Sequence, residues 1–147
     1  MGGLLEEHEK ECARIREDND ALLEEFDQWL SSKGLTESTV DRHCDNVEFY
    51  VNEYLLYERP QPAKEGVFSV GLFLGDWFIR KTTWASQTAI KENARSLKKF
   101  YAFMVHKGEV RQEDLDSLNK EIRDEMSEWL KAAGGGRDSG IDGMWDL

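Results

Sequence analysis

The stretch that decides the fold is SQTAIKENARSLKKFYAFMVHK, residues 86–107. Its apolar residues recur every three or four positions, which is the spacing of one face of an α-helix. Ser86 is a favoured N-cap residue, and Lys107 followed by Gly108 is a common helix end. We therefore predict one long helix over residues 86–107. Its buried side is expected to contain Ile90, Ala94, Leu97, Phe100, Tyr101 and Met104.

The other side of this predicted helix is basic. Residues 80–107 contain seven basic residues and one carboxylate, Glu92, a net charge of +6 in a chain whose net charge is −11. The basic residues are Arg80, Lys81, Lys91, Arg95, Lys98, Lys99 and Lys107. On a helical wheel, one polar arc spans roughly 120°. The arc contains Gln87, Thr88, Lys91, Arg95, Lys98 and Lys99.

Two interpretations of this basic arc stay open. It is long enough to follow several phosphates of a nucleic acid, and hydroxyl and amide groups at its N-terminal end could reach base edges. A lysine-rich helix face also occurs simply because it is solvated, and helix statistics alone favour that interpretation. The charge pattern alone therefore leaves both interpretations open.

Length and composition indicate one aromatic-rich domain. The chain has 147 residues, of which 33% are charged and 39% hydrophobic, with five Trp and seven Phe. Both prolines lie in one short stretch, which favours a mostly helical chain. The acidity is concentrated at the two ends, because residues 1–32 hold ten acids and three bases and residues 111–147 hold ten acids and five bases. The middle of the chain is close to neutral.

The sequence gives no sign of a membrane segment, a signal peptide or a cofactor. No apolar run approaches the roughly 18 residues that span a bilayer, and the N-terminus lacks the basic and apolar regions of a leader. We therefore expect a cytoplasmic protein that does not bind a membrane. His8 and Cys12 form half of a metal site without a second half, and Cys44 stands alone, so we expect reduced thiols and no metal.

The organisation that we predict is all-α. The units are an acidic N-terminal helix at residues 1–19, a helical domain at 20–110, an acidic helix at 111–133 packed on that domain, and a flexible tail at 134–147. The first helix is expected over 4–16, and a second one follows a cap at Asn19 or Asp20. Thr36 is expected to cap the next helix, Arg59-Pro60-Gln61-Pro62 to end it, and a loop to run to about Phe68.

A very apolar helix is expected from Ser69 to about Arg80. Apolar residues lie nearly all round it, which places it in the centre of the core. Gly71 and Gly75, four residues apart, would let another helix approach closely. The segment from Thr82 to Ala85 is expected to be a turn before the basic helix.

Two segments resemble the core-binding domain of tyrosine recombinases, the phage-type integrases. Gly34-Leu35-Thr36-Glu37-Ser38-Thr39-Val40, preceded by a Phe26-to-Leu30 helix, is similar to the start of that family's first long helix. Ser86-Gln87-Thr88-Ala89-Ile90 through Phe103, followed by Lys107-Gly108-Glu109-Val110, is similar to its last long helix. The resemblance covers residues 21–110 and keeps the order and spacing of the helices.

The resemblance implies a compact orthogonal bundle of four core helices, of the SAM-like type, with extra helices at both ends. It also implies that two of the helices face the major groove of DNA. Carried over by position, the candidate DNA-binding residues are Thr39, Arg42 and Asn46 on one helix, and Thr88, Lys91, Arg95 and Lys98 on the other, where the basic arc adds Lys99. The first of these helices also carries Asp41, Asp45 and Glu48, whose charges oppose DNA binding.

The sequence departs from the family where catalysis is concerned. Recombinase chemistry needs a second domain with arginines, a lysine, a histidine and a nucleophilic tyrosine. The 37 residues after Val110 contain neither histidine nor tyrosine. No glycine-rich phosphate loop or base–nucleophile pair is evident elsewhere, so we expect no enzyme, no cofactor and no small-molecule substrate.

Two function hypotheses follow from the sequence. The first is a non-catalytic DNA-binding domain that holds duplex DNA weakly through the basic helix. The second is a protein-interaction module that kept the fold and lost the DNA role, with the acidic flanking helices and the Met144-Trp145-Asp146-Leu147 tail as its contact surfaces. The overall charge argues against tight nonspecific binding of DNA.

Overall fold

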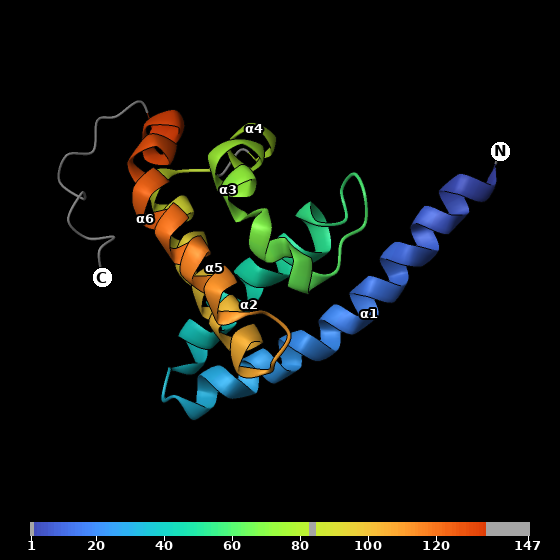
Figure 1. Ribbon diagram of the computed structural model, residues 1–147, viewed down its shortest axis with the longest axis horizontal. Coiled ribbons are helices and arrows are strands. Elements are labelled where there is room, and N and C mark those ends of the chain that lie inside the picture. Colours follow the sequence, from blue (N-terminus) through green and yellow to red (C-terminus); the bar gives the residue numbers. More distant parts are fainter. Residues whose placement is uncertain (1, 83–84, 135–147) are drawn as a thin grey trace.

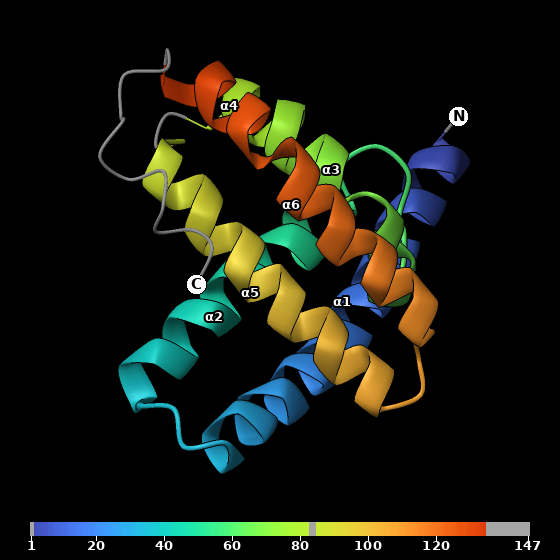
Figure 2. The ribbon, with the colours of Figure 1, turned by 60° about the vertical axis from the view of Figure 1, so that its left-hand side comes forward.

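The basic helix lies at the centre of the molecule. In the computed structural model, which describes residues 2–82 and 85–134, this helix is α5 (Gln87–His106). Ser86 caps it as predicted, because its hydroxyl accepts a hydrogen bond of 3.0 Å from the Ala89 backbone N–H. Gly108, with φ at +85°, ends the chain's helical path as the Lys107-Gly108 signal predicted. Figure 2 shows α5 beside α6 and crossed by α2.

The described residues form helices and connecting turns without a strand, so the all-α prediction is confirmed for this part of the chain. The helices before α5 are α1 (Gly2–Ser32), α2 (Glu37–Phe49), α3 (Val70–Leu72) and α4 (Phe78–Lys81). Three short segments connect them: the π-helical turns η1 (Tyr50–Tyr54) and η3 (Phe73–Trp77), and the 3₁₀ turn η2 (Ala63–Phe68). Helix α6 (Gln112–Gly134) follows α5. The predicted flexible tail lies, from residue 135 on, outside the described residues.

Helix α1 is one continuous helix of 31 residues, so the predicted break at Asn19 or Asp20 is wrong. Asn19 does not cap a new helix. It is buried, and its side-chain Nδ2 donates to the Val51 carbonyl at 3.2 Å and to Asn52 Oδ1 at 2.8 Å. The same amide group that suits a cap therefore joins α1 to η1. The N-terminal turns of α1 extend beyond the other helices (Figure 1), which leaves Leu4 and Leu5 exposed.

Helix α2 begins where the sequence predicted and continues into a π-helical turn. The Thr36 hydroxyl accepts a 3.3 Å hydrogen bond from the Thr39 backbone N–H, so this cap is confirmed. After Phe49 the helix widens into η1, whose Tyr50 ring is fully buried. The widening keeps Tyr50, Val51 and Leu55 in the core while the chain turns toward the prolines.

The segment after the prolines is more regular than the loop that the sequence predicted. It forms the 3₁₀ turn η2, whose carbonyls are held by two buried tyrosines. The Tyr50 hydroxyl donates to the Gly66 carbonyl at 2.6 Å, and the Tyr101 hydroxyl donates to the Ala63 carbonyl at 2.7 Å. These two hydrogen bonds fix η2 between η1 and α5.

The predicted apolar helix consists of α3, η3 and α4 in direct succession, with the π-helical turn in its middle. Its glycines do what their spacing predicted. A Cβ added at Gly71 would collide with the Glu121 carboxylate, and one added at Gly75 would lie 2.6 Å from the Trp129 indole nitrogen. Both side chains belong to α6, so the glycines let α6 pack closely on this segment.

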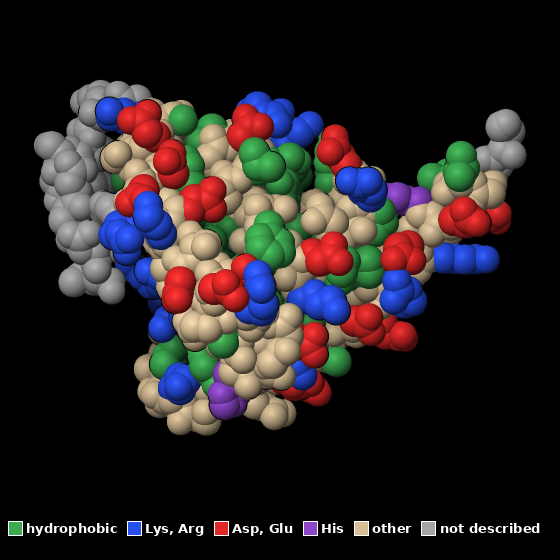
Figure 3. Space-filling view, viewed as in Figure 1, with side chains coloured by type: hydrophobic (Ala, Val, Ile, Leu, Met, Phe, Trp, Pro, Cys, Tyr) green, Lys and Arg blue, Asp and Glu red, His purple; other side chains and the backbone are tan. Residues whose placement is uncertain are grey.

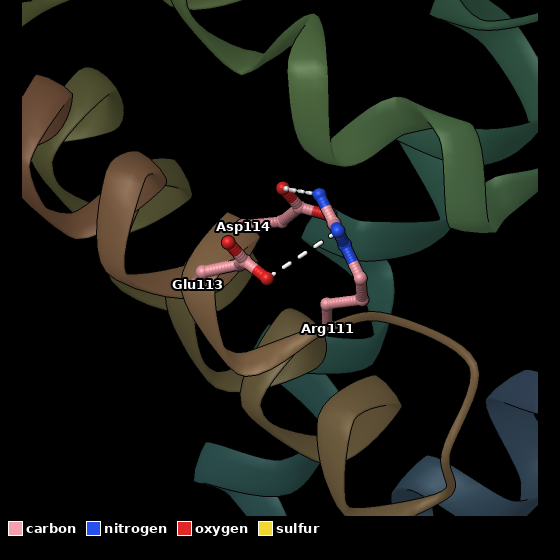
Figure 4. A network of polar contacts seen from close by, with 3 residues as sticks. All are labelled: Arg111, Glu113 and Asp114. Carbon is pink, nitrogen blue, oxygen red and sulfur yellow. Dashed lines mark hydrogen bonds and ion pairs between the residues drawn. The ribbon is translucent and has the colours of Figure 1, made fainter.

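Helix α6 starts beside an ion-pair network (Figure 4). The Arg111 guanidinium donates to Asp114 at 3.2 and 3.3 Å and lies 3.3 Å from the Glu113 carboxylate. Two carboxylates in the first turn also suit the positive end of the helix dipole. The inner side of α6 then packs on the bundle through Leu118, Ile122 and Met126. Within the described ranges, none of the helices has the length and apolar character that crossing a membrane requires.

Candidate nucleic-acid interface

Four of the residues predicted to bind DNA surround one small hollow between α2 and α5. The hollow has a volume of about 130 Å³. From α2 it is lined by the predicted residues Thr39, Arg42 and Asn46, and from α5 by the predicted residue Arg95. His43, Glu92 and Ser96 complete the lining. Residues that are about fifty positions apart in the sequence therefore meet at one place.

The floor of the hollow is a buried hydrogen-bond network. Ser96, which has no exposed surface, lies with its Oγ 2.7 Å from His43 Nδ1. The Asn46 side-chain amide donates to the same Oγ at 3.0 Å. Because the serine hydroxyl accepts from Asn46, its own proton is available for the histidine nitrogen. The network therefore holds α2 and α5 in a fixed register.

His43 is neutral near pH 7. Its pKa is lowered from 6.5 to about 4, chiefly because the ring is buried and further because Lys99, Arg42 and Arg95 are close to it. Arg42 and Arg95 line the hollow, and Lys99 is close enough to act on His43. A neutral imidazole accepts a hydrogen bond from Ser96 and adds no charge of its own. The positive charges at the hollow are therefore those of the two arginines, with Lys99 near them.

Two of the carboxylates of α2 lie away from the hollow. At 100° per residue, Asp41 and Glu48 lie roughly 120° and 140° from the middle of the arc that contains Arg42 and Asn46, whereas Asp45 lies only about 80° from it. Burial of the Cys44 thiol raises its pKa to about 11, and these three carboxylates together with Asp27 of α1 add to the rise. Helix α2 therefore keeps Asp41 and Glu48 away from Arg42 and Asn46, while Asp45 lies between that arc and the side of Cys44.

The remaining predicted residues of α5 do not all lie at the surface. Thr88 and Lys98 are exposed, and Lys99 is half-buried, but none of the three lines the hollow. Lys91 is only 9% exposed, so its predicted place on the solvent-facing arc is wrong. Gln87, also predicted to face solvent, is buried and donates to the Leu130 carbonyl of α6 at 2.8 Å. Helix α6 covers that edge of the arc, which periodicity within α5 cannot reveal.

The site could hold an anion that carries several oxygen atoms. Arg42 and Arg95 are exposed at its rim, and a guanidinium matches the geometry of a phosphate or carboxylate. Thr39 and Asn46 add a hydroxyl and an amide. The Glu92 carboxylate is part of the same rim and reduces the positive charge there. A volume of this size admits one phosphate-sized group and leaves the remainder of a larger ligand on the surface.

Sequence reasoning missed His43 and Ser96 as parts of this site. Ser96 belongs neither to the predicted polar arc of this helix nor to its predicted buried side. His43 is one turn after Thr39 on the same side of α2, which was a usable signal. Only the packing of α2 on α5 shows that the two side chains meet.

The thiols and histidines give no metal centre in the described part of the chain. No group of three or more metal-ligating side chains occurs there. His8 and Cys12 do approach each other on α1, with Nδ1 3.8 Å from Sγ. Cys12 is buried, and its Sγ also contacts the Leu56 carbonyl at 3.9 Å.

Comparison with known proteins finds no relative of this chain. No protein-family model, no curated protein and no solved structure matches this chain.

Proposed function

We propose that this chain is a non-catalytic domain of the recombinase core-binding type that binds duplex DNA through α2 and α5. The observation that carries the proposal is the convergence of Thr39, Arg42, Asn46 and Arg95 on one hollow. These residues belong to two segments that are separate in the sequence. Their meeting at one surface is what a two-helix DNA interface requires.

The charge distribution supports the same surface. Arg42, Arg95 and Lys99 are close enough to His43 to lower its pKa, whereas Asp41, Asp45 and Glu48 act on the thiol of Cys44 and raise its pKa. Exposed Lys98 and Thr88 extend the polar surface along α5. A DNA backbone lying across this surface would therefore meet cations first, although the net charge of the whole chain is −11. We expect weak binding that depends strongly on salt.

Charge reversal at the hollow tests this proposal. Fluorescence anisotropy with a labelled duplex would be measured at two salt concentrations for the native chain and for Arg42→Glu/Arg95→Glu. We expect the logarithm of the native affinity to fall with the logarithm of salt at a slope of roughly 0.9 per phosphate contacted. The double variant should bind at least about tenfold more weakly.

Arg123→Glu/Lys131→Glu is the matched control, because it reverses two exposed charges on α6 and leaves the hollow unchanged. This control should lose much less affinity than the α2–α5 variant. An equal loss in both variants would show that only the total charge matters. The proposal fails if the native chain does not bind duplex DNA at low salt.

A protein-interaction module is the second candidate function. The observation that favours it is the projecting start of α1, where Leu4 is 81% exposed and Leu5 is 64% exposed among acidic residues. Exposed leucines on a projecting helix suit contact with another protein. Leu4→Ser/Leu5→Ser should then abolish recovery of a partner in a pull-down. Unchanged recovery would remove this segment of α1 from the contact surface.

A further inference from the structure

A second hollow, of about 440 Å³, lies between the turn that follows η1 and the segment α3–η3–α4. It shares no residue with the hollow between α2 and α5. Its volume is within the range of roughly 300–1,000 Å³ that is usual for small-molecule sites. The residues that line it are Tyr54, Tyr57, Glu58, Arg59, Gln61, Leu72, Asp76, Trp77, Arg80 and Lys81.

Aromatic rings form one wall of this hollow. Tyr57 and Trp77 lie edge to face with their centroids 5.6 Å apart, and Tyr54 and Trp77 do the same at 5.2 Å. Tyr57 is 54% exposed, although a tyrosine ring gains from burial. Leu72, which is 68% exposed, extends the apolar surface. Flat, partly exposed rings of this kind are suited to stack on a planar ligand.

The rim of the hollow has more cations than carboxylates. Arg59, Arg80 and Lys81 stand against Glu58 and Asp76, in a chain that is strongly acidic as a whole. Hydrophobic and basic side chains adjoin each other over α3 and α4 (Figure 3). The rim therefore favours an anionic ligand over a cationic one.

Contacts within the rim hold two of its three cations, Arg80 and Lys81, in place. The Arg80 guanidinium donates to both Asp76 carboxylate oxygens at 2.9 Å, which neutralises this pair. The Lys81 ammonium lies 5.2 Å from the Tyr57 ring centroid and donates to its hydroxyl at 3.2 Å. Lys81 therefore places a positive charge directly beside the exposed ring. An organic cation at the same ring would be repelled by this ammonium.

We propose that this hollow binds a nucleobase together with its attached phosphate. The base stacks on Tyr57 beside Trp77, and the phosphate contacts Lys81 and Arg59. Stacking on an aromatic side chain tolerates any base, so the site recognises a class of ligand and not one sequence. The ligand is either a free mononucleotide or an unpaired nucleotide in a single strand. This inference uses none of the residues of the proposed duplex interface.

Calorimetric titrations separate the two sources of the ligand. The native chain would be titrated with adenosine monophosphate, with thymidine monophosphate, with a single-stranded 12-mer and with inorganic phosphate. Binding of both mononucleotides more tightly than phosphate supports the proposal and identifies a small-molecule site. Binding of the single strand alone supports it and identifies nucleic acid. The proposal is overturned if neither binds at millimolar concentration, or if phosphate binds as tightly as the nucleotides.

Substitution of Tyr57 tests the role of the ring. Tyr57→Ala should weaken nucleotide binding by about tenfold or more, because base stacking is lost. Tyr57→Phe keeps the ring and should bind within about threefold of the native chain. Phe68→Ala is the control, since Phe68 is an exposed aromatic residue outside the lining of the hollow. Equal binding by Tyr57→Ala and the native chain would overturn the proposal.

The test is distinct from that of the duplex interface. Tyr57→Ala should leave binding of duplex DNA unchanged, and Arg42→Glu/Arg95→Glu should leave binding of mononucleotides unchanged. Either proposal can therefore fail while the other stands.

Discussion

His43 Nδ1 lies 2.7 Å from Ser96 Oγ, and this contact joins α2 to α5 beneath the candidate DNA-binding surface. The hydroxyl is the donor because the imidazole is neutral, and it accepts in turn from Asn46. The same three side chains line the hollow that Arg42 and Arg95 flank. The protonation state of one histidine is therefore coupled to the packing of both helices.

Stability should fall when the pH drops below about 6.5. The pKa of His43 is about 4 in the folded chain, against 6.5 for an ordinary histidine such as that of the unfolded chain, so the unfolded chain binds the proton more readily between these values. Above pH 6.5 the stabilisation is fully present, and below about pH 4 its loss is complete. The loss is at most about 3 kcal/mol. Urea unfolding at several pH values would measure it.

Carboxylates also titrate in the acid range, so a variant is needed to isolate the histidine. His43→Asn cannot bind the proton but offers an oxygen to Ser96. Its stability should depend less on pH between 6.5 and 4 than that of the native chain. Identical pH profiles for the two proteins would contradict the assigned pKa of His43.

Asn19→Ala should destabilise the fold by about 1–3 kcal/mol. The substitution leaves the Val51 carbonyl and Asn52 Oδ1 without their buried donor. Asp20→Ala, at the exposed neighbouring position, should change stability by less than about 0.5 kcal/mol. Chemical denaturation of the two variants gives the comparison. Equal effects would show that the amide of Asn19 does not fasten α1 to η1.

Gly75→Ala should also be destabilising, by about 1–3 kcal/mol. The new methyl group would lie 2.6 Å from the nitrogen of the Trp129 indole, and that ring is buried. Where a helical glycine has free space around it, replacing it with alanine should stabilise the helix, because alanine loses less backbone entropy on folding than glycine does. Gly3, around which nothing lies within 4 Å, is that position, and Gly3→Ala should leave the melting temperature unchanged or slightly raised. A stable Gly75→Ala protein would mean that α6 does not pack so closely on η3.

Cys44 should react slowly with iodoacetamide at pH 8. Burial, together with Asp27, Asp41, Asp45 and Glu48, raises the pKa of its thiol from 9.0 to about 11. At pH 8 the reactive thiolate is therefore about a hundred times scarcer than for an ordinary thiol. Mass spectrometry would follow alkylation of the Cys12→Ser variant from pH 7 to pH 10. A rate equal to that of the unfolded chain at pH 8 would refute the shift.

The sequence predicted most of the local structure because local structure depends on near neighbours. The caps at Thr36 and Ser86 were read from residue type and spacing, and both are confirmed. The close approach at Gly75 was expected from glycine spacing alone, without its partner Trp129. The same local reasoning failed at Asn19, because an amide that can cap a helix can equally well bond to a distant carbonyl.

What depends on contacts between distant segments could not be read from periodicity. Helical periodicity within α5 predicts that Lys91 faces solvent, but Lys91 is buried in the folded chain. The meeting of Ser96 with His43 depends on how α2 crosses α5, and no local signal encodes that crossing. The sequence pattern did not predict the π-helical turns η1 and η3 either, because such turns adjust a helix to the elements packed against it.

The two tyrosines that hold η2 have a consequence for the order of assembly. The donor for Gly66 comes from η1 and the donor for Ala63 comes from α5, so η2 can settle only after both have come together. We therefore predict that residues 63–68 join the folded structure late, so that protection of their backbone amides follows docking of the surrounding helices. Pulsed hydrogen exchange during refolding should find these amides protected after those of α5.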